Sequence, residues 1–418
     1  MRILIVTAGS RGDVAPYTGL GARLRRAGHE VSVATHTGFA ASVREAGLGF
    51  HALPADPRAE LSSAAGQRLL HAGTGARAVI ELLRMGRALM PALGQGILAA
   101  ASHGTDLLLL SATTAPLGRV VAEALGLPSM GVFLQPLAPT GAFAPLLAGN
   151  RVQGGEHVNR LVGRTVQSAT DHLFAPTVRT LRRQLGLPAR SALAQRRHDV
   201  RQLWPVLHGF SPSVVPRPAD WPPGMRVAGY WWPSPAPDWH PSPQLADFLR
   251  AGPPPVYVGF GSLVVADAAR LGNIVTTALR SAGLRAVVQP GWTGLKVTGD
   301  DVLTVDEVPH HWLFPRMAAV VHHAGAGTTA AGLRAGVPAV PVPAQMDAPF
   351  WAARLTRLGV SPGPVPLRDL SADRLTAALR QATDTPAFRG RAQALATRIA
   401  GEDGAGAVVA AVGRLSGG

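Results

Sequence analysis

The sequence predicts an α/β protein with two doubly wound parallel sheets. Short apolar runs alternate with segments of helical character along most of the chain, which is the pattern of repeated βαβ units. At 418 residues the chain is long for a single domain. A proline-rich stretch from Ser211 to Pro243 interrupts the alternation near the middle. We therefore expect two domains, each with its own sheet.

The first half begins with a predicted strand at 2–7, a loop at 8–12 and a helix that Asp13 opens and that ends near Gly28. A strand at 31–35 completes a βαβ unit. Gly9 and Gly12 do not supply the Gly-x-Gly-x-x-Gly fingerprint of a dinucleotide site, so we interpret the loop as one wall of a cleft. The remaining elements expected here are a helix and strand within 44–50, strands at 107–110 and 129–134, helices around 79–90, 115–126 and 158–185, and loops at 51–75 and 136–157.

The boundary between the domains follows from the proline-rich stretch. We assign 1–215 to the first domain, 216–243 to a linker rich in proline and tryptophan, 244–400 to the second domain and 401–418 to a final helix. A solvated linker would explain the prolines but not the tryptophans, which are Trp221, Trp231, Trp232 and Trp239. We expect these indole rings to pack on a domain face.

The second half repeats the alternation with two further βα units at its end. The expected elements are helices at 244–251 and 267–282, strands at 255–260, 285–289, 302–305, 318–321 and 339–342, and late helices at 371–382, 386–400 and from 405 onward. Thr328 and Thr329 are expected to cap a helix that stops at Gly336, and Asp347 to open the next helix.

The loop after 318–321 has the chemistry of a diphosphate site. Gly325, Ala326 and Gly327 expose backbone N–H groups, and Thr328 and Thr329 add hydroxyls at the positive end of a helix. His322 and His323 precede this loop, and adjacent strand residues face opposite sides, so at least one histidine can face a ligand. Loops at the carboxyl ends of parallel strands are where open α/β sheets bind ligands.

Composition narrows the classes of function. The absence of cysteine excludes disulfides, thiolate metal sites and thiol nucleophiles. The net charge of +15 comes almost entirely from arginine, since Lys296 is the only lysine. Either these arginines form a solvated basic surface, or they attract anionic donors or a membrane surface. The second interpretation depends on a dense group, namely Arg179, Arg182, Arg183, Arg190, Arg196, Arg197 and Arg201. Nucleic acid is not expected as a partner, because no binding motif is present and only 5% of residues are aromatic.

The chain carries no pattern of export or membrane insertion. Its first apolar run is too short for the apolar region of a signal peptide, and it fits a buried first strand better. No run reaches the roughly 18 apolar residues that a membrane span needs. We expect a soluble, cytoplasmic protein that is a monomer or a homodimer.

Three stretches resemble one enzyme family, namely TAGSRGDVAPY at 7–17, PPPVYVGFGS at 253–262 and VDEVPHHWLFPRMAAVVHHAGAGTTAAGLRAG at 305–336. They are similar to the nucleotide-sugar-dependent glycosyltransferases with two facing Rossmann-like domains, the GT-B fold. Within this family the bacterial enzymes that glycosylate antibiotics are most similar, together with sterol glucosyltransferases. The resemblance implies an interdomain cleft, an acceptor-binding first domain, a donor-binding second domain and a last helix that crosses back to the first. The loops at 51–75 and 136–157 would shape the acceptor pocket.

Several site residues follow from the resemblance. Asp13 matches the catalytic base, although an aspartate at this point also serves as a helix cap. Ser10, Arg11 and Gly12 share its loop and would face the donor phosphates. His323 would hold the diphosphate together with Gly325, Ala326, Gly327, Thr328 and Thr329, while His322 would be structural. Ser262 would face the same site, the nucleobase would lie over Val308-Pro309-His310, and Trp292 either flanks the base or belongs to the core.

Asp347 and Ala348 bear on the donor sugar. The family pattern is an acid followed by glutamine, and both bind sugar hydroxyls; this chain has alanine in place of the glutamine. Asp347 could also be only a helix cap. If it binds sugar, the loss of the neighbouring amide favours a sugar with fewer hydroxyls, so a TDP- or UDP-linked deoxysugar is expected.

These observations predict an inverting glycosyltransferase that moves a deoxysugar onto a hydroxyl of a hydrophobic natural product. No metal or other cofactor is expected, because the sequence lacks Asp-x-Asp and His-Glu-x-x-His patterns. The alternative within the class is a sterol or lipid glucosyltransferase that uses UDP-glucose, which the basic segment favours through a weak membrane-surface contact. A binding protein that keeps the fold without turnover is a third hypothesis, and retention of Asp13, His323 and Asp347 argues against it.

Overall fold

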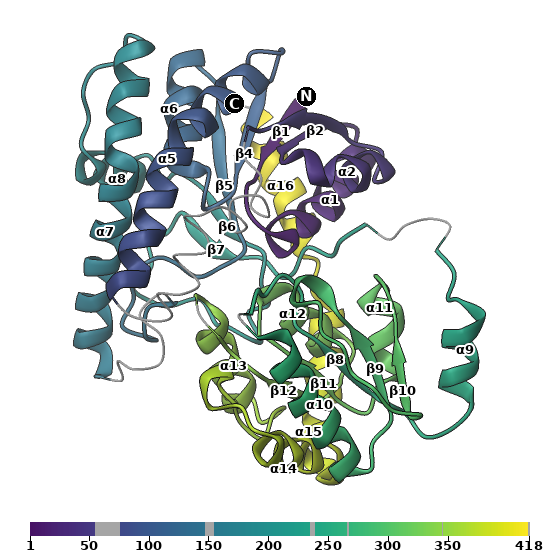
Figure 1. The fold of residues 1–418 in the computed structure, drawn as a ribbon. Coiled ribbons are helices and arrows are strands. Elements are labelled where there is room, and N and C mark those ends of the chain that lie inside the picture. Colours follow the sequence, from purple (N-terminus) through teal and green to yellow (C-terminus); the bar gives the residue numbers. More distant parts are fainter. Residues whose placement is uncertain (55–75, 147–153, 235–238, 266, 345, 417–418) are drawn as a thin grey trace. The chain divides into compact units, whose positions relative to one another are not determined.

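The computed structural model describes residues 1–54, 76–146, 154–234, 239–265, 267–344 and 346–416. Contacts within the chain divide it into two compact units (Figure 1). Unit 1 comprises Met1–Ala148, Val152–Ala236 and Glu402–Gly418, and unit 2 comprises Pro237–Gly401. The predicted loop at 51–75 lies almost entirely outside the described residues, as does part of that at 136–157.

Seven parallel strands form one sheet in the described part of unit 1, in the order β3-β2-β1-β4-β5-β6-β7. They are β1 (Arg2–Val6), β2 (Glu30–Thr35), β3 (Gly49–Ala52), β4 (Leu107–Leu110), β5 (Ser129–Phe133), β6 (Val206–His208) and β7 (Met225–Val227). The strand order reverses between β1 and β4. The loops that follow these two strands therefore separate at the carboxyl edge, where doubly wound sheets bind ligands.

Helices cover both faces of this sheet because alternate strand residues face opposite sides. Ile3 and Ile5 pack with α1 (Arg11–Arg26), α2 (Ala40–Glu45) and α16 (Gly404–Ser416). Leu4 and Val6 pack with α5 (Ala76–Ala101), α6 (Ala115–Leu125) and α7 (Gly155–Gln184). The α5 helix is longer than the predicted 79–90 and continues through Pro91, because Leu93 and Ile97 extend its buried face.

The last helix belongs to unit 1 although it follows unit 2 in the sequence. Val408 and Val412 of α16 are fully buried in the same cluster as Tyr17 of α1. The Trp231 indole Nε1 donates to the carbonyl of Gly404 at 3.2 Å, and the Ser211 hydroxyl donates to Glu402 at 2.6 Å. These contacts join both ends of the chain in one core.

Much of the predicted linker is part of unit 1. The β7 strand lies inside it and pairs with β6, and the two units divide between Ala236 and Pro237. Trp221 and Trp231 are only 3% and 2% exposed, as expected for rings that pack on a domain. In unit 2 the Trp239 ring meets Trp312 edge-on, with centroids 5.2 Å apart.

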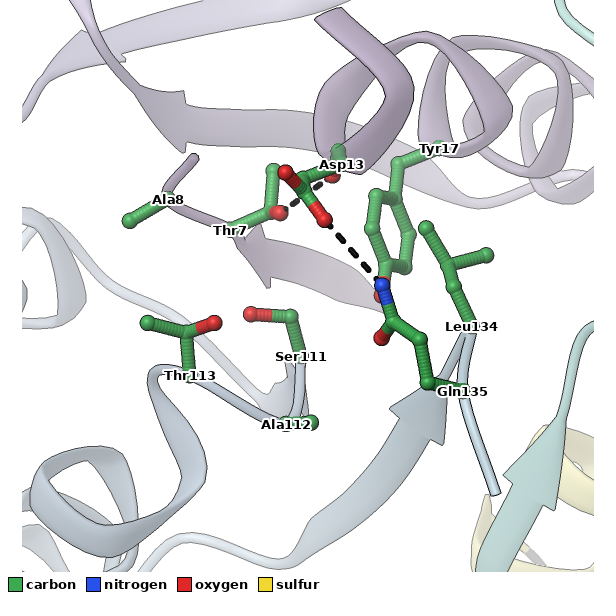
Figure 2. Close-up of a pocket in the computed structure, with 9 residues that line it drawn as sticks. All are labelled: Thr7, Ala8, Asp13, Tyr17, Ser111, Ala112, Thr113, Leu134 and Gln135. Atoms are coloured by element: carbon green, nitrogen blue, oxygen red, sulfur yellow. Dashed lines mark hydrogen bonds between the residues drawn. The ribbon is translucent and has the colours of Figure 1, made fainter. Parts of the chain in front are cut away.

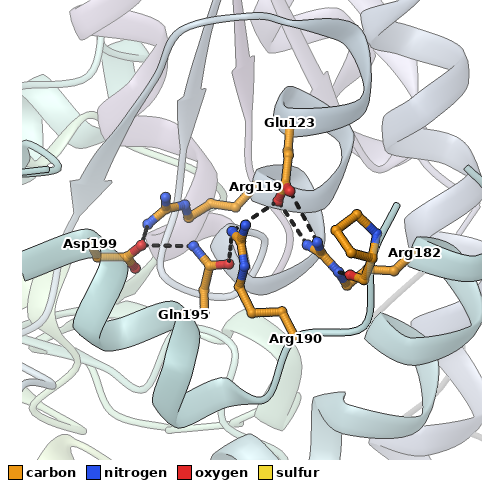
Figure 3. A network of polar contacts seen from close by, with 7 residues as sticks. Arg119, Glu123, Arg182, Arg190, Gln195 and Asp199 are labelled. Atoms are coloured by element: carbon orange, nitrogen blue, oxygen red, sulfur yellow. Dashed lines mark hydrogen bonds and ion pairs between the residues drawn. The ribbon is translucent and has the colours of Figure 1, made fainter. Parts of the chain in front are cut away.

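Part of the basic segment is held in a polar network between helices (Figure 3). Arg182 of α7 is buried and donates to both carboxylate oxygens of Glu123 on α6, at 2.7 and 3.0 Å. Arg190 donates to the same carboxylate at 3.2 Å, and Arg196 of α8 (Ala192–Arg201) pairs with Asp171. These three arginines therefore fasten helices together, which reduces the support they give to a membrane-surface contact. That contact stays a prediction.

Unit 2 contains a second sheet, with five parallel strands among its described residues, in the order β10-β9-β8-β11-β12. They are β8 (Val256–Gly259), β9 (Ala286–Gln289), β10 (Val302–Thr304), β11 (Val320–His322) and β12 (Ala339–Pro341). The order again reverses after the first strand, between β8 and β11. Both sheets thus have the doubly wound topology that the sequence predicts.

The helices of unit 2 also lie on both faces of its sheet. Val256 and Val258 pack with α10 (Ala268–Ala282) and α14 (Ala372–Asp384). Tyr257, on the other side, packs with α9 (Pro243–Arg250) and α11 (His310–Leu313). The remaining helices described are α12 (Ala326–Arg334), α13 (Ala348–Arg357) and α15 (Pro386–Ala400).

Two predicted helix starts are wrong by a few residues. The α1 helix begins at Arg11, with Ser10 as the N-cap, so Asp13 lies in its first turn instead of opening it. The α12 helix begins at Ala326 with Gly325 as the N-cap, so Thr328 and Thr329 lie inside the helix. In both places a residue earlier in the loop already has the extended backbone of a cap.

No helix in the described part of the chain has the length and apolar character that crossing a bilayer requires.

Candidate active site

A small hollow opens at the carboxyl edge of the unit 1 sheet, where the strand order reverses (Figure 2). Loops after β1, β4 and β5 and the first turns of α1 contribute its walls. The lining residues are Thr7, Ala8, Asp13, Tyr17, Ser111, Ala112, Thr113, Leu134 and Gln135. Its volume of about 10 Å³ is roughly that of one water, so it can admit a reacting group but not a whole acceptor.

Asp13 contributes its carboxylate to this hollow. One oxygen, Oδ2, accepts the Ser10 N–H at 2.9 Å and the Ser10 hydroxyl at 3.0 Å. The other, Oδ1, accepts a longer bond from the Gln135 amide at 3.3 Å (Figure 2). The carboxylate thus closes a capping box with Oδ2 and presents Oδ1 beside the polar groups of the hollow.

Burial raises the pKa of Asp13 above its ordinary range. The hydrogen bonds from Ser10 and Gln135 favour the charged form and oppose this shift without cancelling it. Tyr17, on the next turn of α1, donates its hydroxyl to the Val132 carbonyl at 2.6 Å, and burial raises the pKa of this phenol as well. Asp13 is therefore the group in the hollow suited to accept a proton.

The other predicted residues of this loop lie elsewhere. Ser10 caps α1 and does not line the hollow, while Arg11 and Gly12 are exposed. Sequence reasoning missed Gln135, Ser111 and Thr113. Ser111 and Gln135 directly follow the buried strands predicted at 107–110 and 129–134, which is the position of ligand-binding loops, and Thr113 lies two residues after Ser111.

His323 lies at the corresponding edge of unit 2, between two glycine loops. A Cβ on Gly325 would come within 2.4 Å of the ring Nε2, and one on Gly261 within 3.0 Å of Cε1. The ring is thus enclosed by backbone from the loops after β8 and β11. Its Nδ1 is buried and has no hydrogen-bond partner among the described residues.

The two histidines differ in their surroundings. His322 is fully buried, and its Nδ1 accepts the Ala324 N–H at 3.1 Å, which holds the loop in a left-handed turn at Ala324. Burial lowers the pKa of His322 to about 3 and that of His323 to about 4, so both rings are neutral near physiological pH. His323 therefore offers a hydrogen bond and not a fixed positive charge.

The N-terminus of α12 follows directly. Gly325, Ala326, Gly327 and Thr328 keep partial or full exposure, so the free N–H groups of the first turn are accessible. Thr329 is 1% exposed, and its hydroxyl has no partner among the described residues. Unsatisfied donors at a positive helix end are suited to an anionic ligand.

Ser262 and Trp292 lie on loops near this region, whereas the side chain of Val308 is buried in the core. Ser262 follows Gly261 and is half-buried. The Trp292 backbone N–H donates to the Gly261 carbonyl at 2.9 Å, which brings the two loops together, and its side chain is half-buried. Val308 is 9% exposed and packs in the core beneath α11, so only its backbone is available to a base.

Asp347 and Ala348 form the start of α13. Asp347 is the N-cap but makes no capping bond with its side chain; its Oδ2 instead accepts the Trp351 indole N–H at 2.8 Å. Ala348 is 5% exposed, so the methyl group is largely enclosed. The structure thus removes the simple capping explanation for the Asp347 carboxylate.

No cluster of three or more histidine, aspartate or glutamate side chains that could hold a metal ion occurs among the described residues.

Two family models match the chain. The C-terminal domain of erythromycin biosynthesis protein CIII-like proteins matches residues 289–414, and the N-terminal domain of glycosyltransferase family 28 matches residues 3–143. The first match covers most of the unit 2 site and α16. The second covers the whole hollow around Asp13.

Similar proteins match over nearly the whole chain. The O-mycaminosyltylonolide 6-deoxyallosyltransferase of Streptomyces fradiae is 38% identical over 97% of this chain and 95% of its own length. A sterol 3-beta-glucosyltransferase of Arabidopsis thaliana is 33% identical over 99% of this chain and 68% of its own length. Among solved structures, the Streptomyces sp. SF2575 glycosyltransferase complexed with thymidine diphosphate has a TM-score of 0.65 at 23% identity, with 99% of each chain covered.

These matches agree with the sheet topology and with the resemblance in the three sequence stretches. The structural neighbour supports the fold, and the curated relative from Streptomyces fradiae supports the enzyme class. This chain therefore belongs to the GT-B glycosyltransferase family that includes the antibiotic glycosyltransferases and the similar sterol glucosyltransferases, and it is a nucleotide-sugar-dependent glycosyltransferase.

Proposed function

We propose that this glycosyltransferase moves a deoxysugar from a TDP- or UDP-linked donor onto a hydroxyl of a hydrophobic natural product, with inversion at the sugar and with Asp13 as the base. The observation that carries the proposal is the Asp13 carboxylate. It is half-buried, its pKa is raised, and one of its oxygens faces a hollow of suitable size for a hydroxyl.

Asp13 would act on the acceptor. The acceptor hydroxyl gives its proton to Oδ1, and the acceptor oxygen forms a bond to the anomeric carbon of the sugar. The bond from that carbon to the diphosphate breaks on the opposite side, which inverts the configuration in one displacement. A carboxylate with a raised pKa takes a proton more readily than an ordinary one, so burial improves the base.

The unit 2 site would hold the departing diphosphate. The first-turn N–H groups of α12 can donate to phosphate oxygens, and His323 can add one more hydrogen bond, whereas the Thr329 hydroxyl is enclosed. Charge that builds on the diphosphate during bond breaking strengthens each of these bonds. An anion beside His323 also favours its protonated form, so binding would raise the low pKa of this ring.

The donor class is inferred from two relatives and one residue. The name of the Streptomyces fradiae enzyme specifies transfer of a 6-deoxysugar, and the structure from Streptomyces sp. SF2575 contains thymidine diphosphate. Ala348 offers no hydrogen bond at the position where the family pattern that the sequence resembles has a glutamine amide. We infer no metal for this transfer, since hydrogen-bond donors at the positive end of α12 can stabilise the charge of the diphosphate; activity that EDTA abolishes and Mg²⁺ or Mn²⁺ restores would contradict this.

A sterol or lipid acceptor is the second candidate. It is supported by 33% identity to a plant sterol glucosyltransferase over 99% of this chain. Both candidates use the same base and diphosphate site, so they differ in acceptor and donor and not in the mechanism.

The test of the proposal is Asp13→Asn. The amide keeps the shape of the carboxylate but cannot accept the acceptor's proton, so kcat should fall by at least about 100-fold, the usual scale for a general base. TDP affinity, measured by calorimetry, should change little. Asp106→Asn is the matched control, because Asp106 bonds Arg2 at the start of β4, away from the hollow. Near-normal turnover by Asp13→Asn would reduce Asp13 to a helix cap.

A further inference from the structure

The loop that carries Asp13 has a second support, which comes from the neighbouring strand. The backbone N–H of Gly9 donates to His36 Nε2 at 2.9 Å. His36 follows β2 directly and is 3% exposed. Two residues before Gly9, the Thr7 N–H still donates to the Ala34 carbonyl at 3.0 Å, so the last bond between the β1 and β2 segments is accepted by a side chain instead of a carbonyl.

Gly9 in turn lies close to the Asp13 carboxylate. Its φ is +146°, a conformation that side chains rarely adopt, and a Cβ there would lie 2.5 Å from Asp13 Oδ2 and 2.7 Å from Cγ. The next residue, Ser10, supplies both hydrogen bonds to Oδ2. The position of Gly9 therefore determines where the carboxylate and its two donors lie.

The chemistry of this contact specifies the state of His36. A ring nitrogen that accepts an N–H bond carries no proton, so the proton of the neutral imidazole is on Nδ1. His36 is not among the residues that line the hollow, and it touches Gly9 instead. Its hydrogen bond acts on the reaction through the β1–α1 loop, and a charge on its ring would also lower the pKa of the Asp13 carboxyl.

We propose that His36 is a positioning residue for the catalytic carboxylate: its Nε2 holds Gly9, and Gly9 with Ser10 holds Asp13 so that Oδ1 faces the acceptor hydroxyl. The proposal rests on the proposed role of Asp13 as the base. Reactions of this kind are sensitive to displacement, since an error of about 1 Å in the position of a reacting group can cost about 100-fold in rate.

Two amide substitutions separate this role from general stability. In His36→Gln the amide oxygen reaches close to the former Nε2 and can accept the Gly9 N–H, whereas in His36→Asn it ends near the former Nδ1 and cannot. We expect His36→Asn to lower kcat between about 10- and 100-fold and His36→Gln to stay within a few-fold of wild type. Both should leave TDP affinity unchanged, because the residues proposed to bind the diphosphate are on unit 2.

Thr35→Val is the matched control. Thr35 is the preceding residue, is fully buried, and its hydroxyl has no hydrogen-bond partner among the described residues. The substitution keeps the shape of the side chain, so turnover should equal that of wild type. Melting temperatures of all variants show whether each is folded at the assay temperature. If His36→Asn does not fold, His36→Gln decides alone: a folded His36→Gln whose kcat is lowered about 100-fold would overturn the proposal.

The outcomes distinguish the two proposals. If Asp13→Asn is inactive while folded His36→Asn turns over like wild type, the His36 proposal is wrong and Asp13 remains the base. If His36→Gln loses as much activity as His36→Asn, acceptance of the Gly9 N–H is not what matters, and the proposal is equally wrong. If Asp13→Asn keeps normal turnover, the proposed base is wrong, and the role of His36 is overturned with it.

Discussion

Two interpretations of Asp13, a helix cap and the proposed base, compete when only the sequence is considered. As a helix cap it should be engaged by backbone donors, and as a base it should have an oxygen open to substrate. The structure is compatible with both, since Oδ2 bonds Ser10 while Oδ1 lines the hollow with only the 3.3 Å contact to Gln135. Capping therefore orients the carboxylate and is part of how it could act as the base.

The raised pKa of Asp13 predicts a cost in stability. The folded state binds the Asp13 proton more tightly than the unfolded state does. This group therefore contributes stability below its unfolded pKa and loses that contribution as pH rises through the folded pKa. Asp13→Asn removes the buried charge, so it should melt at a higher temperature than wild type near neutral pH. The difference should shrink as the pH falls through the raised pKa of the folded carboxyl, where the wild-type side chain gains its proton.

Asp106→Asn provides a control of opposite sign. Hydrogen bonds from Arg2 lower the pKa of Asp106, so its contribution to stability is present above the unfolded pKa and is lost at lower pH. Asp106→Asn should not melt above wild type at neutral pH. A lower melting temperature for Asp13→Asn at neutral pH would mean that the bonds from Ser10 and Gln135 outweigh the cost of burial.

Single residues differ in how far the sequence could predict them. Asp13 and His323 follow from the resemblance of short motifs, because the motif carries both the residue and its neighbours. Gln135 and His36 could not be found in this way. They are 122 and 27 residues from the groups that they contact, and only the strand order brings them together.

The strands and helices of both units were predicted closely where apolar runs were long, and less well where elements were short. The β6 and β7 strands have three residues each and lie beside or within the proline-rich stretch, so no periodic pattern could indicate them. The start of α12 was misplaced because threonine is a good cap by type. Gly325 takes the cap position, since a side chain there would collide with His323.

This collision predicts the effect of a small change in the N-terminus of α12. Gly325→Ala is compatible with the backbone, whose φ is −67°, but its Cβ would lie 2.4 Å from His323 Nε2. The ring must therefore move. We expect TDP affinity, measured by calorimetry, to fall in Gly325→Ala and in His323→Ala alike. The loss of one charge-assisted hydrogen bond corresponds to about 1.5–3 kcal/mol, or about 10- to 150-fold in Kd.

Gly332→Ala in the same helix is the control. A Cβ at Gly332 would meet no atom within 4 Å, so alanine should raise stability by roughly 0.5–1 kcal/mol through its helix propensity. TDP affinity should not change. If Gly325→Ala binds TDP as wild type does while His323→Ala does not, the ring tolerates the methyl group and the enclosure of His323 is looser than the contacts indicate.

At the scale of the whole molecule, length and alternation were enough to predict two doubly wound sheets, but charge was a poor guide. The net charge of +15 includes arginines that hold helices together, as Arg182 does through both oxygens of Glu123. A buried pair of this kind holds α6 and α7 together. Composition alone cannot distinguish its arginine from an arginine on the surface. The boundary between the units was equally hard to predict from the sequence. The prolines of this stretch suggest a linker, but its buried tryptophans make part of it belong to unit 1.

The donor sugar is not decided by similarity over the whole chain. Identities of 38% to a 6-deoxyallosyltransferase and 33% to a sterol glucosyltransferase are too close to separate them. We base the prediction on Ala348, where a sugar hydroxyl without a partner would lose roughly 1–3 kcal/mol, or about 5- to 150-fold in selectivity. With one acceptor, kcat/KM should therefore be higher for a TDP-deoxysugar than for UDP-glucose.

Two substitutions at this position test the explanation. Ala348→Gln should shift the ratio of kcat/KM toward the fully hydroxylated sugar, because it restores the amide. Ala348 is only 5% exposed, so the larger side chain needs room, and Ala348→Ser offers a hydroxyl with little added volume. Melting temperatures establish that both variants are folded. A wild type that prefers UDP-glucose, with a ratio that neither folded variant changes, would mean that Ala348 carries no donor information, and the sterol-type activity would then be the better proposal.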